Sequence, residues 1–288
     1  MDFGQLHLFS QTTDMLAEGY EKLSVFDFEN AESVFHQINK TISEKESDSE
    51  RGLFCTGYWK EVFERLEKMV STENVPYLFD QIERFEFNNH WGFQKLRSSL
   101  ITHLIGLMLQ QDRFYVNEKI AISDLYLQIA KRQIAERSLT GRINTTPADT
   151  PARFRLAHLQ WNQKLKGTAL RNYALGLLFD PESAPAQYLM CDQTAALIKS
   201  HGTHMTPAYG WIAGILPLMQ VPEAVTPVSE NHRNALACYG VMREAEKASK
   251  KRDMETCVEL RKELKSGWPE LYQEYYKLIS KRTQPSLY

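Results

Sequence analysis

Apolar residues recur three and four positions apart along most of this chain, and that spacing allows few folds other than a helical one. The segment Phe93–Gln110 shows it most clearly, because its leucines and isoleucines share one broad helical face. Alternation of apolar and polar residues, the mark of a half-buried strand, is nearly absent. Neither Asn-Gly nor Asp-Gly, the usual tight hairpin turns, occurs. The pattern predicts about thirteen helices and no sheet.

The breaks between these helical segments are short and fall at intervals of roughly 30 to 40 residues, which is the length of a helix pair. The sequence therefore predicts a single helical array over residues 1–288. The strongest break is Thr140–Pro151, which holds two prolines and several turn formers. A subdivision into 1–140 and 151–288 around the loop 140–151 remains the alternative.

One stretch carries a more specific pattern. Gly19 is followed by Phe28, Ala31 and Phe35, so that small and aromatic residues stand at fixed helical offsets. This stretch, within residues 15–42, resembles one unit of the tetratricopeptide repeat family. The resemblance implies that Gly19 and Ala31 lie where two antiparallel helices cross closely. It also implies an α–α superhelix that binds a protein or peptide partner along a groove.

The match is incomplete. Glu18, Lys22 and Ile38 stand where the family has leucine, tyrosine and alanine, and no proline closes the unit. Three further segments match in part: Leu175, Gly176 and Phe179; Ala245, Ala248, Met254 and Cys257; and Gly106 and Leu109. The resemblance covers about a third of the chain, and an irregular helical bundle remains the alternative architecture.

The cellular setting follows from simple features. The four cysteines, of which no two are closer than 19 residues, are expected to be reduced and buried in a cytoplasmic protein. The N-terminus lacks the basic and apolar regions of a secretory signal. The most apolar stretch, Thr206–Pro222, is too short to span a membrane and contains Pro217, so we expect a buried core helix there.

Catalytic signatures were sought and not found. The sequence holds no phosphate-binding loop, HExxH, Gly-x-Ser-x-Gly or ExxH motif, so we assign no catalytic residues, no metal ligands and no cofactor. His201 and His204 are the only closely spaced histidines, and Asp192 is the nearest acid that could complete a metal site. If the chain is an all-α enzyme or a small-molecule or metal binder, this loop and Tyr209 are the first residues to consider.

Charge is distributed unevenly although the net charge is only −2. Residues 1–50 hold eleven acids and three bases, whereas residues 142–171 hold six bases and one acid. Aromatic residues lie within the basic segment, an arrangement that suits an acidic partner surface or, less well, the phosphates and bases of a nucleic acid. The predicted partner-binding residues are Arg153, Arg155, Trp161, Lys164, Lys166 and Arg171.

The leading hypothesis is therefore a non-enzymatic helical-repeat scaffold that binds a protein or peptide, one with an acidic surface if the basic segment makes the contact. An enzyme or ligand binder near His201 and His204 is the first alternative, and nucleic-acid binding through residues 142–171 is the second. No membrane association is expected, and a homo-oligomer is compatible with the opposed charges.

Overall fold

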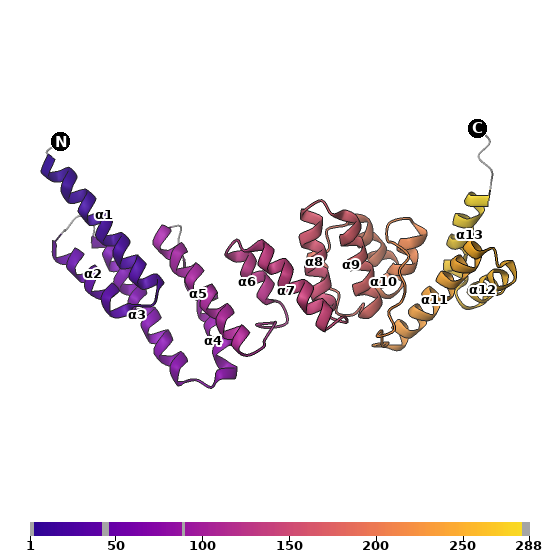
Figure 1. Ribbon diagram of the computed structural model, residues 1–288, viewed down its shortest axis with the longest axis horizontal. Helices are drawn as coiled ribbons and strands as arrows, with labels where there is room; N and C mark the ends of the chain where they lie inside the picture. The colour runs from indigo at the N-terminus through magenta and orange to yellow at the C-terminus, as the bar shows by residue number, and fades with distance from the viewer. Residues whose placement is uncertain (1–2, 42–45, 88–89, 284–288) are drawn as a thin grey trace. The chain divides into compact units, whose positions relative to one another are not determined.

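The computed structural model describes residues 3–41, 46–87 and 90–283, and these residues form thirteen α-helices and one short 3-10 helix (Figure 1). The extended backbone in these ranges is confined to one isolated bridge between Tyr115 and Ala121. The predicted all-α fold and its number of helices are confirmed for this part of the chain.

Contacts divide the chain into two compact units, residues 1–135 and 136–288. The helices of the first unit are α1 (Phe3–Ser24), α2 (Phe28–Thr41), α3 (Glu46–Lys68), α4 (Ser71–Arg84), α5 (Trp91–Gln110) and α6 (Ile122–Gln128). Successive helices pack on one another, and α1 also packs on α5. The helix α5 contacts α1, α4 and α6, so the segment with the widest apolar face is central to its unit.

A phenylalanine between three helices organises the start of the first unit. Phe35 of α2 is fully buried, and Cβ atoms at Gly19 of α1 and Gly52 of α3 would lie 2.6 and 2.5 Å from its ring. Only glycine leaves room for the ring at such a distance. The predicted close approach at Gly19 is therefore confirmed, and Ala31, also fully buried, lies in the same core.

Tyr20, the residue after Gly19 in α1, also packs its ring against a glycine of a neighbouring helix. Its ring occupies the space beside Gly92 at the start of α5, and it packs edge-on against Phe35 and Phe93, with ring centroids 5.1 and 5.8 Å apart. Burial raises the pKa of Tyr20, with a smaller contribution from Cys55, so the phenol stays protonated in the core. These contacts join α1, α2 and α5 into one hydrophobic core.

The second unit begins inside α7 (Arg132–Thr145) and continues through seven further elements. They are α8 (Thr150–Asn162), α9 (Lys166–Phe179), η2 (Ala186–Tyr188), α10 (Asp192–Ile212), α11 (Glu230–Lys251), α12 (Met254–Gly267) and α13 (Pro269–Thr283). The closest pairs are α8 with α9 and α11 with α12. Side chains cap several of these helices: Asp149 accepts from Ala152 N, Ser229 from His232 N and Asp253 from Thr256 N.

The helices α8 and α9 pack closely against each other at Gly176. A Cβ there would lie 2.9 Å from the Phe154 ring, and the Gly176 carbonyl accepts a hydrogen bond of 2.8 Å from Thr150 Oγ1. In the tetratricopeptide pattern, Leu175, Gly176 and Phe179 belong to the first helix of a unit, whose partner is the helix that follows. Its partner is instead the preceding helix, since the pairing depends on Phe154, 22 positions upstream.

The other two partial matches differ from each other. Ala245, Ala248 and Cys257 are buried where α11 packs on α12, in agreement with the expected helix pair. Met254, the fourth residue of that match, is 60% exposed at the start of α12 and takes no part in the packing. At Gly106 a Cβ would meet nothing within 4 Å, and Leu109 is 62% exposed, so this segment makes no close helix crossing.

Two expected secondary-structure assignments are corrected. Residues 140–145 continue α7 rather than forming a loop, because Leu139 and Ile143, one turn apart, are buried and hold that turn on the core. Of the segment Thr206–Pro222, only the part up to Ile212 is helical, since Gly214 adopts φ 70° and turns the chain, which lets Leu216 pack on Gly210.

The remaining expectations concern cysteines and membranes. All four cysteines are buried and unpaired as predicted, and burial raises the pKa of Cys55 and Cys238 to about 12. Within the described ranges, no helix has the length and apolar character needed to cross a bilayer.

Candidate functional site

The basic segment is split by the fold. Arg153 and Arg155, which we expected on a binding surface, are only 7% and 3% exposed in α8. Arg153 donates from Nε to the Pro147 carbonyl at 2.8 Å and lies 4.9 Å from the Phe179 ring centroid. Burial lowers its pKa, an effect that Asp149 opposes. The guanidinium of Arg155 lies 4.5 Å from the Tyr188 ring centroid. Both arginines are part of the interior.

The other four residues of the predicted surface lie in the last turn of α8, in the turn that follows, or in the first half of α9. Lys164, Lys166 and Arg171 are exposed, and Trp161 is half-buried. The ammonium group of Lys166 lies 5.3 Å from the Trp161 ring centroid, a cation–π contact. The structure thus brings Trp161 and Lys166 together and separates them from Arg153 and Arg155.

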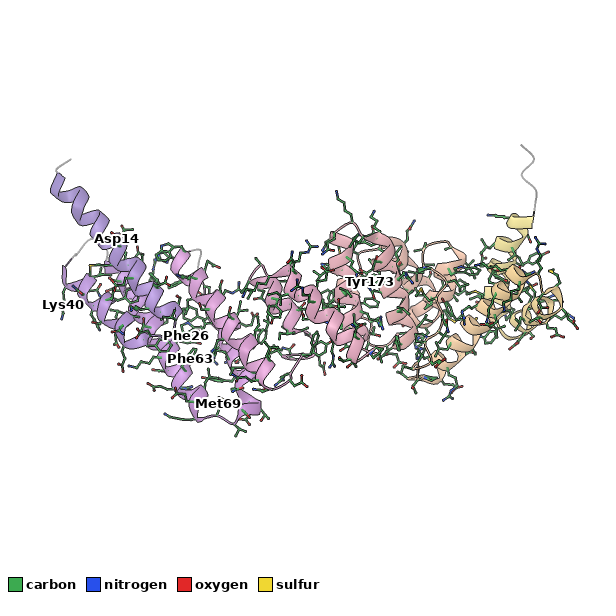
Figure 2. All side chains as sticks on the ribbon, in the orientation of Figure 1. Asp14, Phe26, Lys40, Phe63, Met69 and Tyr173 are labelled. Carbon is green, nitrogen blue, oxygen red and sulfur yellow. The ribbon has the colours of Figure 1, made fainter. Side chains whose placement is uncertain are left out.

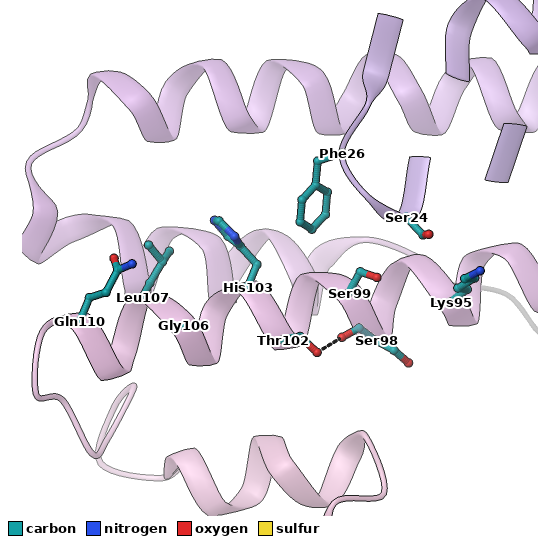
Figure 3. A pocket seen from close by; sticks show the side chains of 10 residues that line it. All are labelled: Ser24, Phe26, Lys95, Ser98, Ser99, Thr102, His103, Gly106, Leu107 and Gln110. Atoms are coloured by element: carbon teal, nitrogen blue, oxygen red, sulfur yellow. Dashed lines mark hydrogen bonds between the residues drawn. The ribbon is translucent and has the colours of Figure 1, made fainter. Parts of the chain in front are cut away.

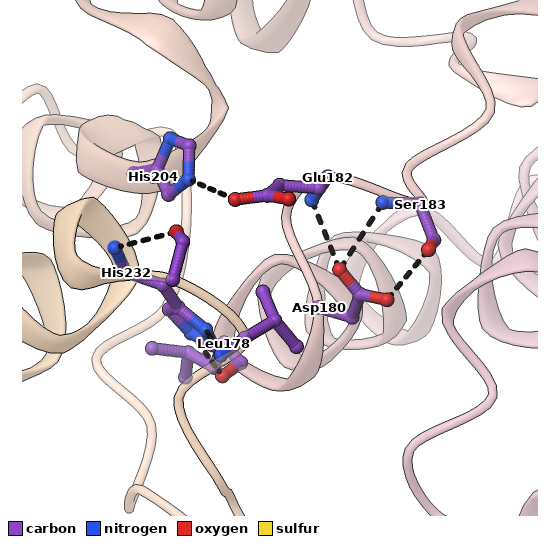
Figure 4. A network of polar contacts seen from close by, with 8 residues as sticks. Leu178, Asp180, Glu182, Ser183, His204 and His232 are labelled. Atoms are coloured by element: carbon purple, nitrogen blue, oxygen red, sulfur yellow. Dashed lines mark hydrogen bonds and ion pairs between the residues drawn. The ribbon is translucent and has the colours of Figure 1, made fainter.

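A polar network surrounds His204. Its Nε2 lies 3.3 Å from Glu182 Oε1 (Figure 4). Hydrogen bonds from Ser229, and then from His204, lower the pKa of Glu182. His232, buried nearby, accepts at Nδ1 from the Val228 amide and shares a 3.0 Å hydrogen bond between Nε2 and the Leu178 carbonyl. A neutral ring satisfies both bonds, and burial lowers the pKa of His232 accordingly.

This network does not activate a nucleophile. In a catalytic triad the imidazole stands between the serine and the carboxylate and removes the serine proton. Here Glu182 stands between Ser229 and His204, and Ser229 also caps α11. The arrangement fastens the segment after α9 to the start of α11. The described part of the chain holds no group of three histidine, cysteine or acidic residues placed to share a metal ion.

His201 has a different surrounding from His204. Its ring stacks on that of Tyr209, with centroids 3.7 Å apart and planes inclined by 11°. Both rings line a hollow in the second unit. The sequence had grouped His201, His204 and Tyr209 as one possible site. His201 and Tyr209 do lie together, whereas His204 belongs to the polar network. Asp192, at the start of α10, does not form a three-residue metal site with His201 and His204.

A hollow of about 520 Å³ lies along one side of α5 in the first unit (Figure 3). Its lining from α5 recurs at helical spacing: Lys95, Ser98, Ser99, Thr102, His103, Gly106, Leu107 and Gln110. Ser24 at the end of α1 and Phe26 in the turn that follows form the opposite wall. Below, this surface is called the α5 face.

The hydroxyl groups of the α5 face are largely satisfied by their own helices. Ser98 and Thr102 donate to carbonyl groups four residues earlier, at 2.9 and 2.8 Å, and Ser24 donates to Glu21 O at 2.8 Å. These side chains thus present mainly their methylene and methyl groups. Lys95 forms an ion pair with Glu21. The face is small, neutral and open along four turns of helix.

Phe26 gives this face its aromatic edge. It adopts φ 65°, a left-handed conformation that costs a residue with a Cβ about 1–2 kcal/mol. Its ring lies 4.6 Å from that of Phe63 and 5.4 Å from that of His103, between centroids (Figures 2 and 3). Desolvation lowers the pKa of His103, so the imidazole favours its neutral form.

Sequence reasoning missed the α5 face because its residues carry no charge cluster or motif. The available signal was the polar interruption of an apolar helix: Ser98, Ser99, Thr102 and Gly106 all lie on one side of α5. Such an interruption normally marks plain solvent exposure. Only the position of Phe26 turns this side into a hollow.

Comparisons with known proteins give no further guide. No protein-family model, curated protein or solved structure matches the chain.

Proposed function

We propose that this chain is a non-enzymatic scaffold of helical pairs, of the tetratricopeptide-like kind, that binds a helical segment of a protein partner along the α5 face. The observation that carries the proposal is a hollow that runs along one side of α5, a helix that packs on three others in its unit. From Lys95 to Gln110 this side is about 22 Å long. A partner helix of four turns matches that length.

The composition of the α5 face suits a closely approaching helix. Helix crossings elsewhere in this unit use glycines whose Cβ positions are filled by an aromatic ring, as at Gly19 and Gly52. Gly106 offers the same opening with nothing in it. Phe26 and Leu107, both half-buried, supply apolar contact at the two walls. A partner helix with a bulky apolar side chain opposite Gly106 complements these features.

The test is a library of displayed helical peptides, selected on the wild-type protein and then measured against two variants. Gly106→Leu fills the α5 face, whereas Gly57→Leu places the same side chain at an exposed helical glycine of α3 that also has nothing within 4 Å. We expect selected peptides to lose at least tenfold in affinity, about 1.4 kcal/mol, with Gly106→Leu. The same peptides should bind Gly57→Leu as they bind the wild type.

Peptides that bind all three proteins equally would place recognition elsewhere. Circular dichroism of both variants checks that each keeps its helices, so a lost peptide cannot be attributed to a lost fold.

A further inference from the structure

The hollow that His201 and Tyr209 line in the second unit has a volume of about 500 Å³. It lies between α10, α11 and the junction of α12 with α13, and Trp268 at that junction is part of its wall. Three rings that present π faces or edges, His201, Tyr209 and Trp268, thus border one space. The site is separate from the α5 face and does not depend on the function proposed for it.

A kink makes this arrangement. His201 and Tyr209 are eight positions apart, so in a straight helix their Cα atoms would be about 12 Å apart. Gly202 interrupts α10 with φ 74° and ψ 163°, a conformation that is open almost only to glycine. The helix therefore bends at Gly202, and the His201 ring stacks flat on Tyr209.

Trp268 forms the second wall of the hollow, and contacts with three helices hold it in place. Its indole Nε1 donates to Asn234 Oδ1 of α11 at 3.1 Å. Its backbone amide caps α12 through the Leu264 carbonyl, and its own carbonyl accepts from Tyr272 at the start of α13. Trp268 is thus fixed by three elements, and its ring is available as a preformed surface of the hollow.

The charge of the hollow has one sign. Glu270 lies in its wall, and none of its nine lining residues is a lysine or an arginine. Burial, and then the charge of Glu270, raise the pKa of Tyr209, with smaller contributions from Cys238 and Glu274. Aromatic rings beside a carboxylate are the surroundings that favour ammonium and guanidinium groups, because π faces and a carboxylate both attract positive charge.

We propose that this hollow, bordered by His201, Tyr209, Trp268 and Glu270, binds an organic cation through cation–π contacts and the Glu270 carboxylate. The cation is an ammonium or guanidinium group with a small alkyl portion, for which Met205 supplies apolar contact. A free small molecule and the side chain of a lysine or arginine both carry this chemistry.

The test is a titration of the ¹⁵N-labelled full chain, followed by NMR at the indole resonance of Trp268. The probes are choline and the blocked tripeptides acetyl-Gly-Arg-Gly-amide and acetyl-Gly-Lys-Gly-amide. Their neutral controls are 3,3-dimethylbutanol and acetyl-Gly-norleucine-Gly-amide, which keep the shape without the charge. Among the five tryptophans, Trp161 lies beside Lys166 and serves as an internal reference.

We expect at least one cationic probe to shift the Trp268 resonance in a saturable way at roughly millimolar concentration, with no saturable shift from its neutral control. Binding of choline alone identifies a small molecule as the source, and binding of the tripeptides alone identifies a protein side chain. Equal shifts from charged and neutral probes, or no saturable shift from any cation, would overturn the proposal.

Three variants separate the site from the fold. Glu270→Gln should weaken cation binding about two- to fivefold, the size of a surface ion pair. Glu255→Gln, at the equivalent first turn of α12 and outside the hollow, should leave it unchanged. Gly202→Ala should abolish the stacking of His201 on Tyr209 and reduce cation binding, while the Trp268 resonance of the unbound protein reports whether the other wall is intact.

Discussion

Gly52 and Gly57 are one and a half turns apart on the same helix and have opposite surroundings. At Gly52 the space for a side chain is filled by the Phe35 ring, whereas at Gly57 it is empty. Gly52→Ala forces a methyl group into a packed core and should lower the free energy of unfolding by about 1–3 kcal/mol. Gly57→Ala should raise it by up to about 1 kcal/mol, because alanine favours the helix.

Urea unfolding of the two variants beside the wild type measures both effects. If Gly52→Ala were as stable as Gly57→Ala, Phe35 could not occupy the position between α1 and α3 from which the start of the first unit is organised.

At the scale of elements, α13 depends on a buried polar contact. Tyr275 is fully buried and donates a hydrogen bond of 2.8 Å to Glu246 of α11, which is only 5% exposed. Burial raises the pKa of Tyr275, so its hydroxyl stays a donor. Tyr275→Phe removes the donor and leaves a buried carboxylate one bond short, which should cost about 1–3 kcal/mol.

The neighbouring Tyr276 is the matched control, because it is 55% exposed. Tyr276→Phe should change stability by less than about 0.5 kcal/mol. Hydrogen exchange locates the effect: amides of α13 should exchange faster in Tyr275→Phe than in Tyr276→Phe. Equal exchange in the two variants would contradict a role for the contact with Glu246 in holding α13.

Elements were far more predictable than contacts. The helices follow from apolar spacing along the chain, and the close approach at Gly19 follows from a local pattern that ends at Phe35. The burial of Arg153 could not be read in this way, since its partners are a carbonyl at Pro147 and a ring at Phe179, 26 positions away. The stacking of His201 on Tyr209 was equally hidden, because it depends on the conformation of Gly202.

The same limit applies to the sites. The charge pattern suggested residues 142–171 as a binding surface, but Arg153 and Arg155 of this segment are buried. The α5 face and the hollow beside Trp268 are defined by what is left uncovered after packing, and a sequence alone does not record that. The sequence marked the loop with His201 and Tyr209 through the close spacing of His201 and His204, which suggested a metal site. The described residues hold no group of three potential ligands placed to share an ion.

At the scale of the whole molecule, each unit has a core made from its own residues. The core of the first unit draws on residues between Leu16 and Leu125, and the two core clusters of the second lie between Phe154 and Tyr275. Ala130, with φ 57°, turns the chain between α6 and α7. Cutting there leaves fragments 1–130 and 131–288, both within the usual size of independent domains.

We expect each fragment to fold alone and to unfold cooperatively in urea, because apolar burial within a unit is what offsets the entropy of ordering its chain. Circular dichroism of the two fragments should then sum to that of the full chain. A fragment that stayed unfolded while the full chain was folded would mean that its core is completed by the other unit. In that case a substitution at the α5 face would also alter the stability of the cation site.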